Sequence, residues 1–350
     1  MDDKEIPKHF CVLPWLHLYI DTWGRAKACC VSQIQYGDVN EQDLDDIWKG
    51  TAIEKVRSNM LMDLRDHRCA TCYRLEDKGH LSLRQSYNQQ YKKHVFDVLE
   101  HQSLLPIAKA PLFWDVRFSN YCNFKCITCW HGASSKWYSA AKEKGQAAGK
   151  QAVLKAFADD SAFFAYFEHY LQHVDSVFMA GGEPLIMPEN KKMLQLLSHS
   201  AARPKVTINT NLSVINQDDI RFWNQNMNLN FQVSFDGIGP KGMEIRDGLK
   251  EKQFYENLAI LQSLVDEHQI SVHFTLSKFN LDLLFPTIRQ FEMLNVPQDH
   301  FMINILERPQ KMQYQYSDSN VNALQQAFDD FKWQSKTLQQ SVKNIIGNIN

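Results

Sequence analysis

The sequence lacks the features that would place this protein on a nucleic acid or in a membrane. Its 38 lysine and arginine residues nearly balance 40 aspartate and glutamate residues, so the formal net charge is −2. A chain this close to neutrality has no electrostatic attraction for nucleic acid or an anionic membrane surface. Met1 to Glu5 contain no apolar signal core, and no apolar run approaches the length of a spanning helix. We therefore expect a cytoplasmic protein without nucleic-acid or membrane partners.

Two enzyme classes also find no support in the sequence. It contains no His-Glu-x-x-His motif, which a zinc hydrolase would carry on a helix. The glycine-containing segment 237–242 lacks the Lys-Ser/Thr ending of a phosphate-binding loop. His273 lies in an expected strand and could face a barrel interior, but we interpret it as a core histidine because histidine is moderately often buried.

The sequence does contain eight cysteines, and three of them form a CxxxCxxC pattern behind an apolar and aromatic run at 112–118. Thiolates from Cys122, Cys126 and Cys129 would cover three corners of a 4Fe-4S cube, so that the fourth iron can bind an outside ligand. A reducing cytoplasm keeps such thiols available and makes disulfides unlikely. The alternative is a zinc site with His131 as fourth ligand. Zinc sites, however, usually come as CxxC pairs, so the spacing favours iron and sulfide.

A Gly-Gly-Glu-Pro segment follows an expected buried strand at 176–180. Gly181 and Gly182 let the backbone approach a ligand closely, and Pro184 holds Glu183 extended, so that its carboxylate can face an ammonium group. Taken alone, this segment would indicate only a turn between a strand and a helix. Its position downstream of the cysteine triplet favours a cofactor site.

Together, the two motifs resemble those of the radical S-adenosylmethionine superfamily, where they occur in the same order. The resemblance implies that the cysteine triplet binds the catalytic cluster and that the Gly-Gly-Glu segment binds the methionyl amino group of S-adenosylmethionine. One departure is visible: the residue before the third cysteine is commonly aromatic, whereas here it is Thr128. This departure concerns the packing of the adenine and not the binding of the cluster.

Polar residues end two further expected strands, at 205–211 and 230–236. Polar groups at the carboxyl ends of barrel strands face the active-site mouth. The segment 233–237, followed by Arg246, resembles the fifth-strand pattern of the family, where ribose and cofactor carboxylate are contacted. Such residues are also ordinary turn formers and could simply cap turns. The cofactor contacts implied by the resemblance are Asn211, Ser234, Asp236 and Arg246.

Five cysteines precede residue 75, at positions 11, 29, 30, 69 and 72. With Gly24, their spacing resembles the twitch form of the SPASM auxiliary-cluster domain, placed before the barrel here and more often after it. Four ligands would close a second 4Fe-4S cluster. The spacing from Gly24 favours Cys29 over Cys30, which is left as a packing residue or a thiol hydrogen donor near the substrate. A zinc knuckle stays open because CxxC pairs are its commonest signature. The implied ligands are Cys11, Cys29, Cys69 and Cys72.

With 350 residues, the chain is long enough for one large domain and a small one. Strands and helices alternate in its middle, which predicts a parallel sheet with right-handed crossovers, either doubly wound or curled into a barrel. The resemblance implies an α/β fold with a partial (β/α)6 TIM-type barrel and a small cysteine-rich amino-terminal domain. The expected regions are an irregular auxiliary domain at 1–75, a helical connection at 76–110, the barrel at 111–308 and a helical extension at 309–350.

The hydrophobic periodicity predicts individual elements within these regions. The expected strands are 112–118, 176–180, 206–209, 230–235, 271–276 and 301–306. The expected helices are 44–61, 82–100, 162–173, 190–200, 254–268, 282–294 and 319–345.

The resemblance implies an enzyme that reductively cleaves S-adenosylmethionine to a 5′-deoxyadenosyl radical, which takes a hydrogen atom from a small metabolite or a peptide. A fully ligated auxiliary cluster would suit accepting an electron, which implies an oxidation or an oxidative bond formation. The implied electron donor is a protein such as flavodoxin or ferredoxin. The alternative is a non-catalytic iron–sulfur or zinc-binding protein with a structural or electron-transfer role. The Gly-Gly-Glu-Pro segment disfavours it, because such a protein needs no site for a cofactor amino group.

Overall fold

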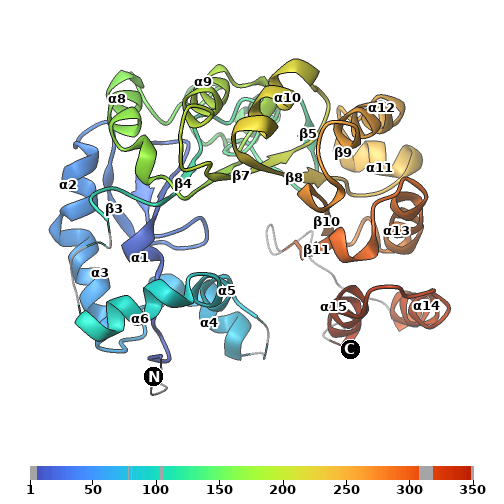
Figure 1. Ribbon diagram of the computed structural model, residues 1–350. Helices are drawn as coiled ribbons and strands as arrows, with labels where there is room; N and C mark the ends of the chain where they lie inside the picture. Colours follow the sequence, from blue (N-terminus) through green and yellow to red (C-terminus); the bar gives the residue numbers. More distant parts are fainter. Residues whose placement is uncertain are drawn as a thin grey trace. The chain divides into compact units, whose positions relative to one another are not determined.

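The computed structural model describes residues 6–77, 79, 81–102, 106, 108–306 and 318–347 (Figure 1). The chain forms two compact units. The first comprises Met1–Ser119, Leu154–Ala180 and Glu189–Val206. The second comprises Asn120–Val153, Gly181–Pro188 and Thr207–Asn350. The helices that the structure describes include none with the length and apolar character of a membrane span.

The first unit contains a mixed sheet with the strand order β3-β2-β1-β4-β6. Strand β1 pairs in parallel with β4, and β4 in parallel with β6, whereas β2 pairs antiparallel with both β1 and β3. The prediction that the region before residue 75 is irregular is therefore wrong, because this region contains β1, β2 and β3. Its strands have only three or four residues each, too few for an alternating pattern to show. The strands are β1 (His17–Ile20), β2 (Arg25–Lys27), β3 (Gln35–Asp38), β4 (Phe113–Val116) and β6 (Ser176–Met179).

Aromatic side chains form the core behind this sheet. Trp114 of β4 is fully buried, and its ring meets Phe163 and Phe167 of α8 (Ser161–His169) edge to face, with centroid distances of 5.8 and 5.6 Å. Such pairs stabilise by about 0.5–1.5 kcal/mol beyond the area they bury. This packing fixes the strand that leads into the cysteine triplet.

The helices of the first unit are more often interrupted than the sequence predicts. The helix expected at 44–61 is divided at Gly50, whose backbone is extended with φ −79° and ψ 166°. The helix expected at 82–100 is divided at Tyr91, where φ is −105° and ψ is 33°. The helices are α1 (Leu13–Leu16), α2 (Leu44–Lys49), α3 (Thr51–Leu61), α4 (Ala70–Asp77), α5 (Leu83–Gln90), α6 (Lys92–His101), α8 and, almost entirely, α9 (Pro188–Leu197).

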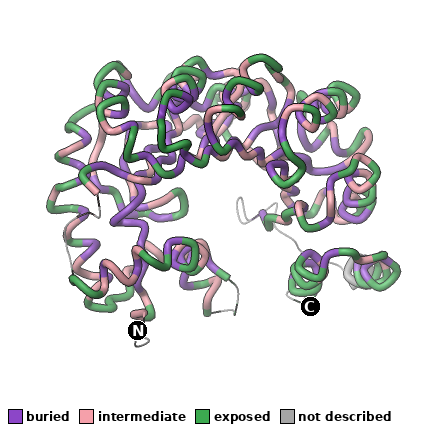
Figure 2. The backbone as a smooth tube through the Cα atoms, in the orientation of Figure 1, coloured by how far each residue is buried: buried purple, intermediate pink, exposed green. Residues whose placement is uncertain are grey.

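The second unit contains parallel strands in the order β11-β10-β8-β7. Along β10, buried residues alternate with half-buried ones, so one face packs against helices and the other is partly open. Figure 2 shows buried backbone along the strands and exposed backbone on the outer sides of the helices. The strands are β7 (Lys205–Thr210), which begins in the first unit, β8 (Asn228–Ser234), β10 (Ile270–Leu276) and β11 (Phe301–Ile305).

Helices connect these strands, as a succession of βα units requires. The helix expected at 254–268 ends earlier, at Gln262, and the one expected at 282–294 begins at Leu284 after a short 3-10 turn. A second, two-stranded antiparallel sheet pairs β5 (Lys125–Cys126) with β9 (Arg246–Asp247). The helices are α7 (Tyr138–Glu143), α10 (Gln217–Asn226), α11 (Gly239–Ile245), α12 (Glu251–Gln262) and α13 (Leu284–Met293).

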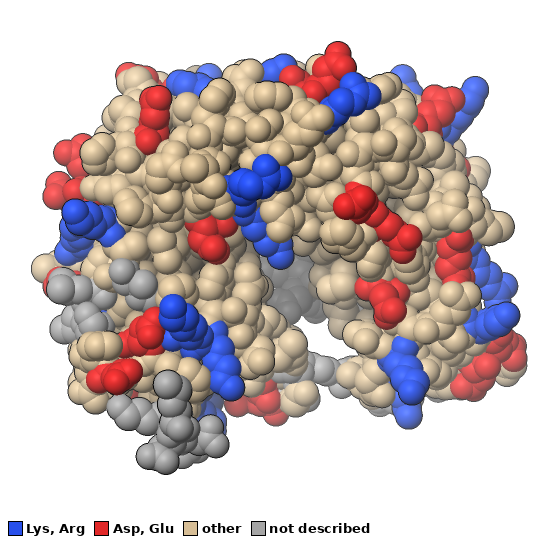
Figure 3. Space-filling view, in the orientation of Figure 1, with Lys and Arg blue, Asp and Glu red and all other residues tan. Residues whose placement is uncertain are grey.

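The carboxyl-terminal region contains two helices, α14 (Asp318–Asp329) and α15 (Lys336–Gly347), where the sequence predicts one. The Ser335 hydroxyl accepts a hydrogen bond from the Leu338 amide at 3.0 Å and so begins a new helix. The first part of the expected extension, residues 309–317, lies outside the described residues. Basic and acidic side chains are interspersed over the face seen in Figure 3, as the near-neutral composition predicts.

Candidate functional site

The three cysteines of the triplet lie close together in the second unit. Cys122 and Cys126 are buried and Cys129 is half-buried. The Cys129 amide donates to the Cys126 carbonyl at 3.0 Å, which closes a tight turn between them. Burial, together with the Cys129 and Cys122 thiols, raises the pKa of Cys126 to about 12, although nearby Arg246 acts in the opposite direction. Thiols of this kind bind a metal by releasing their protons.

Backbone groups are already directed at these sulfurs. The Cys122 sulfur accepts the Phe124 amide at 3.4 Å, and the amide of Trp130 donates to Cys129. The Trp137 indole donates to the Cys126 carbonyl at 2.9 Å and holds the loop from outside. Amide donors to cysteine sulfurs are the groups that stabilise and tune iron–sulfur clusters. The donor set therefore fits a cluster.

Among the described residues, no group of three or more histidine, cysteine, aspartate or glutamate side chains converges closely enough to hold a single metal ion. A 4Fe-4S cube makes a different demand, because each thiolate binds a separate iron.

The Gly-Gly-Glu-Pro segment packs directly against the cysteine loop. Gly181 and Gly182 both have left-handed backbones, with φ of 86° and 55°. A Cβ on Gly182 would lie 2.1 Å from the carbonyl oxygen of Tyr121, which is the residue before Cys122. The next amide, that of Glu183, donates to the same carbonyl at 2.9 Å. Glycine is therefore required at position 182 because the backbone there packs closely against the backbone of the cysteine loop.

The Glu183 carboxylate is buried, with 1% of the residue exposed. It accepts hydrogen bonds from the Thr210 hydroxyl at 2.6 Å, the Asn211 amide at 2.6 Å and the Leu185 amide at 3.1 Å. Desolvation raises its pKa above the ordinary value, although these hydrogen bonds and nearby Arg246 oppose the rise. A carboxylate has about four acceptor positions, so one stays available for a cofactor ammonium group. Of the other three, the bonds from Thr210 and Asn211 fasten the loop to the end of β7, and the bond from Leu185 stays within the loop.

Asn211 joins β7 to the cysteine loop a second time. Its side-chain amide donates to the side-chain Oδ1 of Asn123, the residue after Cys122, at 3.0 Å, and its own side-chain oxygen accepts the Ser213 amide at 2.9 Å. The second contact is the turn-forming role that the sequence allowed. Ser234, on β8, donates to the Asn209 side chain at 2.8 Å. These contacts order the strand ends around the triplet.

Asp236 and Arg246 form a buried ion pair, with 2.8 Å between Oδ2 and Nη1. Pairing of β9 with β5 places Arg246 opposite Cys126. Burial opposes the charge on Arg246, but Cys126 and Asp236 raise its pKa above the ordinary value. Its Nε–H is buried and has no hydrogen-bond partner in the described part of the chain. A buried cationic donor beside the thiols fits an anionic ligand.

His273 of β10 belongs neither to the buried core nor to the charged site. It is half-buried, and its Nδ1 lies 3.3 Å from the side-chain amide of Asn304 on β11. Desolvation lowers its pKa to about 4, so this imidazole is neutral at physiological pH.

A second set of cysteine thiols lies in the first unit. The thiols of Cys69 and Cys72 both act on the pKa of Cys11, which burial raises to about 12. Cys29 likewise has Cys11 and Cys72 among its electrostatic neighbours. Cys30 is exposed. The four predicted ligands of the auxiliary cluster are thus electrostatic neighbours, and Cys30, although exposed, also has Cys72 among its neighbours.

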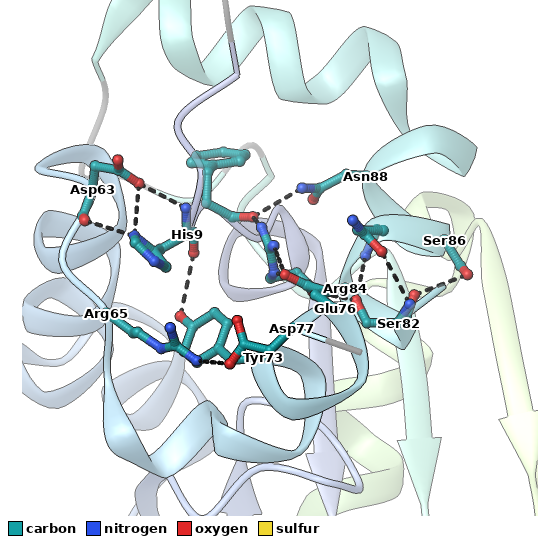
Figure 4. Close-up of polar contacts among 12 residues, drawn as sticks. His9, Asp63, Arg65, Tyr73, Glu76, Asp77, Ser82, Arg84, Ser86 and Asn88 are labelled. Atoms are coloured by element: carbon teal, nitrogen blue, oxygen red, sulfur yellow. Dashed lines mark hydrogen bonds and ion pairs between the residues drawn. The ribbon is translucent and has the colours of Figure 1, made fainter. Parts of the chain in front are cut away.

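A polar network holds the backbone of Phe10, the residue before Cys11 (Figure 4). Arg84 of α5 pairs with Glu76 of α4 and donates to the Phe10 carbonyl at 2.6 Å, and Asn88 donates to the same carbonyl at 2.9 Å. Arg84 thereby becomes a cationic neighbour of Cys11. The sequence contains no local signal for this network, because its members come from three separate segments.

Two family models match the chain. Residues 11–73 match SPASM, an iron–sulfur cluster-binding domain, and residues 116–281 match the Radical SAM superfamily. The chain thus contains a radical S-adenosylmethionine superfamily domain behind an iron–sulfur cluster-binding domain. The two domains imply S-adenosylmethionine, a catalytic cluster and an auxiliary cluster as cofactors.

Solved structures give further matches. "Native anSMEcpe with bound AdoMet" is 14% identical with a TM-score of 0.46, covering 68% of this chain and 62% of that one. Streptococcus suis SuiB is 14% identical with a TM-score of 0.43, covering 93% and 69%. The match therefore spans less than two thirds of anSMEcpe. No curated protein matches the sequence.

The predicted α/β class with a partial TIM-type barrel and a cysteine-rich amino-terminal domain is confirmed. The assignment of individual residues to each ligand stays a prediction. Sequence reasoning missed the side chains that position the site. Thr210 was expected as one of the polar residues that end its strand, but its role in holding Glu183 was not. The contact of Asn123 with Asn211 has no signal in the sequence other than the position of Asn123 between Cys122 and Cys126.

Proposed function

We propose that the enzyme cleaves S-adenosylmethionine reductively at a 4Fe-4S cluster held by Cys122, Cys126 and Cys129, giving a 5′-deoxyadenosyl radical that takes a hydrogen atom from the substrate. One observation carries the proposal: the Gly-Gly-Glu-Pro loop is bonded to the cysteine loop. The Glu183 amide donates to the Tyr121 carbonyl at 2.9 Å. A cofactor bound to the open corner of the cluster therefore lies beside the loop that would hold its amino group.

The protein's own task is to orient the cofactor. The remaining acceptor position of Glu183 would take the ammonium group, and the unpartnered Nε–H of Arg246 would take the carboxylate. Asp236 fixes the guanidinium by the 2.8 Å ion pair. Burial of both charged groups strengthens these contacts, because the local dielectric constant is low. We place Asn211 and Ser234 at the ribose side, where they end neighbouring strands.

We further propose that Cys11, Cys29, Cys69 and Cys72 close an auxiliary 4Fe-4S cluster. A cluster with four protein ligands has no corner open to substrate and suits electron transfer. This supports an oxidation or an oxidative bond formation, on a small metabolite or a peptide. An electron donor such as flavodoxin or ferredoxin would supply the reducing electron.

The decisive experiment is anaerobic incubation of the purified protein with S-adenosylmethionine and a strong reductant, followed by chromatography for 5′-deoxyadenosine. We expect product from the wild type and none from C126S. The matched control is C30S, which removes an exposed cysteine that we do not assign to a cluster. If the wild type gives no 5′-deoxyadenosine while it contains about eight irons per chain, as two cubes require, the protein is a non-catalytic iron–sulfur protein.

A further inference from the structure

Tyr36 has a buried hydroxyl that the proposed function does not use. The residue lies on β3 with 5% of its surface exposed, and within the described residues its hydroxyl has no hydrogen-bond partner. A buried hydroxyl without a partner costs about 1–3 kcal/mol. Proteins rarely retain such a group unless it serves a ligand or a water molecule.

The surroundings of this hydroxyl are the thiols of the first unit. Cys11, Cys29 and Cys69, which are three of the four proposed auxiliary ligands, are its electrostatic neighbours. The fit to a cluster is therefore direct, because sulfur atoms of thiolates and sulfides accept hydrogen bonds. Arg57 and Arg68 are cationic neighbours of Tyr36 as well.

A break in the sheet places Tyr36 there. Strand β2 pairs with β3 through Ala26↔Gly37 and Lys27↔Gln35, so Tyr36 is the extra residue of a β-bulge. Bulges re-aim a side chain relative to its strand and occur preferentially beside functional sites. Strand β2 ends at Lys27, two residues before Cys29, so the bulge lies close in the chain to a proposed ligand.

The hydroxyl is held as a donor. A phenol has an ordinary pKa of about 10, so the Tyr36 O–H is protonated at neutral pH and can donate. Arg57 is fully buried, and its Nε donates to the Pro14 carbonyl at 3.0 Å. Arg57 is therefore held in place as a cationic neighbour of Tyr36.

We propose that the Tyr36 hydroxyl donates a hydrogen bond to a sulfur of the auxiliary cluster and raises the reduction potential of that cluster. The proposal rests on the assignment of Cys11, Cys29, Cys69 and Cys72 as its ligands. Reduction adds negative charge to the sulfurs, so a hydrogen bond to them is stronger in the reduced state and stabilises it. Tyr36 is thus a tuning residue that acts through the cluster and does not touch the substrate.

The test is Y36F, which removes only the oxygen. An anaerobic redox titration followed by electron paramagnetic resonance measures the auxiliary signal, which added S-adenosylmethionine leaves unchanged while it alters the catalytic one. We expect the reduction equilibrium constant to fall about tenfold, or about 59 mV for one electron. The matched control is Y73F. Tyr73 also has Cys69 and Cys11 as neighbours, but its hydroxyl donates to the His9 carbonyl at 3.5 Å (Figure 4), so we expect no shift.

The outcomes separate this proposal from the proposed function. An auxiliary signal with the same potential in Y36F as in the wild type overturns the role of Tyr36 and leaves the function standing. Absence of any auxiliary signal from wild-type protein removes the ligand assignment itself. Should Y36F fail to assemble the cluster, wild-type protein labelled with a magnetic oxygen isotope in its tyrosine hydroxyls decides the matter. Hyperfine coupling from such an oxygen to the reduced cluster supports the bond, and its absence overturns it.

Discussion

Replacing Arg246 by methionine tests the electrostatic core of the catalytic site. The guanidinium Nη1 lies 2.8 Å from Oδ2 of Asp236, and the two side chains are 9% and 0% exposed. The other oxygen of Asp236 accepts the Thr275 amide at 2.7 Å. R246M keeps most of the side-chain volume but leaves a buried carboxylate with a backbone amide as its donor.

The burial of both partners sets the magnitude. Removing one member of a buried ion pair costs about 3–5 kcal/mol, because the other charge stays in a low dielectric without its partner. D236N should be similarly costly, since it leaves Arg246 as the unpaired charge. The double variant R246M/D236N removes both charges. Its loss of unfolding free energy should fall short of the sum of the single losses by about 1–3 kcal/mol.

Anaerobic urea unfolding, followed both by tryptophan fluorescence and by the visible absorption of the clusters, measures these differences. Two probes are needed because a chain with two units and bound cofactors can depart from two-state unfolding. The control is K241A, which breaks an ion pair to Asp282 whose partners are 46% and 64% exposed. That loss should be about 0–1 kcal/mol. The reasoning would be refuted if R246M lost as little unfolding free energy as K241A. It would also be refuted if the losses of R246M and D236N added up to that of the double variant.

The remaining predictions concern the ligands, the loop and a helix. C126S and C69S should each lower the iron content from about eight to about four per chain, because each removes a ligand of a different cube; anaerobic iron and sulfide analysis checks both. G182A places a Cβ 2.1 Å from a backbone carbonyl, so equilibrium dialysis should find at least about tenfold weaker S-adenosylmethionine binding, a loss of about 1.4 kcal/mol. S82A removes the capping box that begins α5 and should cost about 1 kcal/mol in urea unfolding.

The chemistry proposed for the two sites could be predicted from the sequence alone. CxxxCxxC and Gly-Gly-Glu-Pro are local patterns, and their spacing limits which ligands they can bind without any knowledge of distant contacts. The sequence also determined the parallel α/β class, because strands such as β8 and β10 are seven residues long and show regular alternation. Periodicity identifies elements of this length.

Only the tertiary structure decided how those motifs are held. Thr210 reaches Glu183 across 27 residues of chain and Arg84 reaches Phe10 across 74, and no local pattern encodes such contacts. The breaks at Gly50 and Tyr91 were decided in the same way, since helix propensity is weaker than the packing of two short helices on one core. The bulge that leaves Tyr36 outside the regular pairing of β2 and β3 is likewise a feature of the folded sheet. The physical reason is that the partners of these groups lie far away in the sequence. A buried polar group is stable only when folding supplies its hydrogen-bond partners.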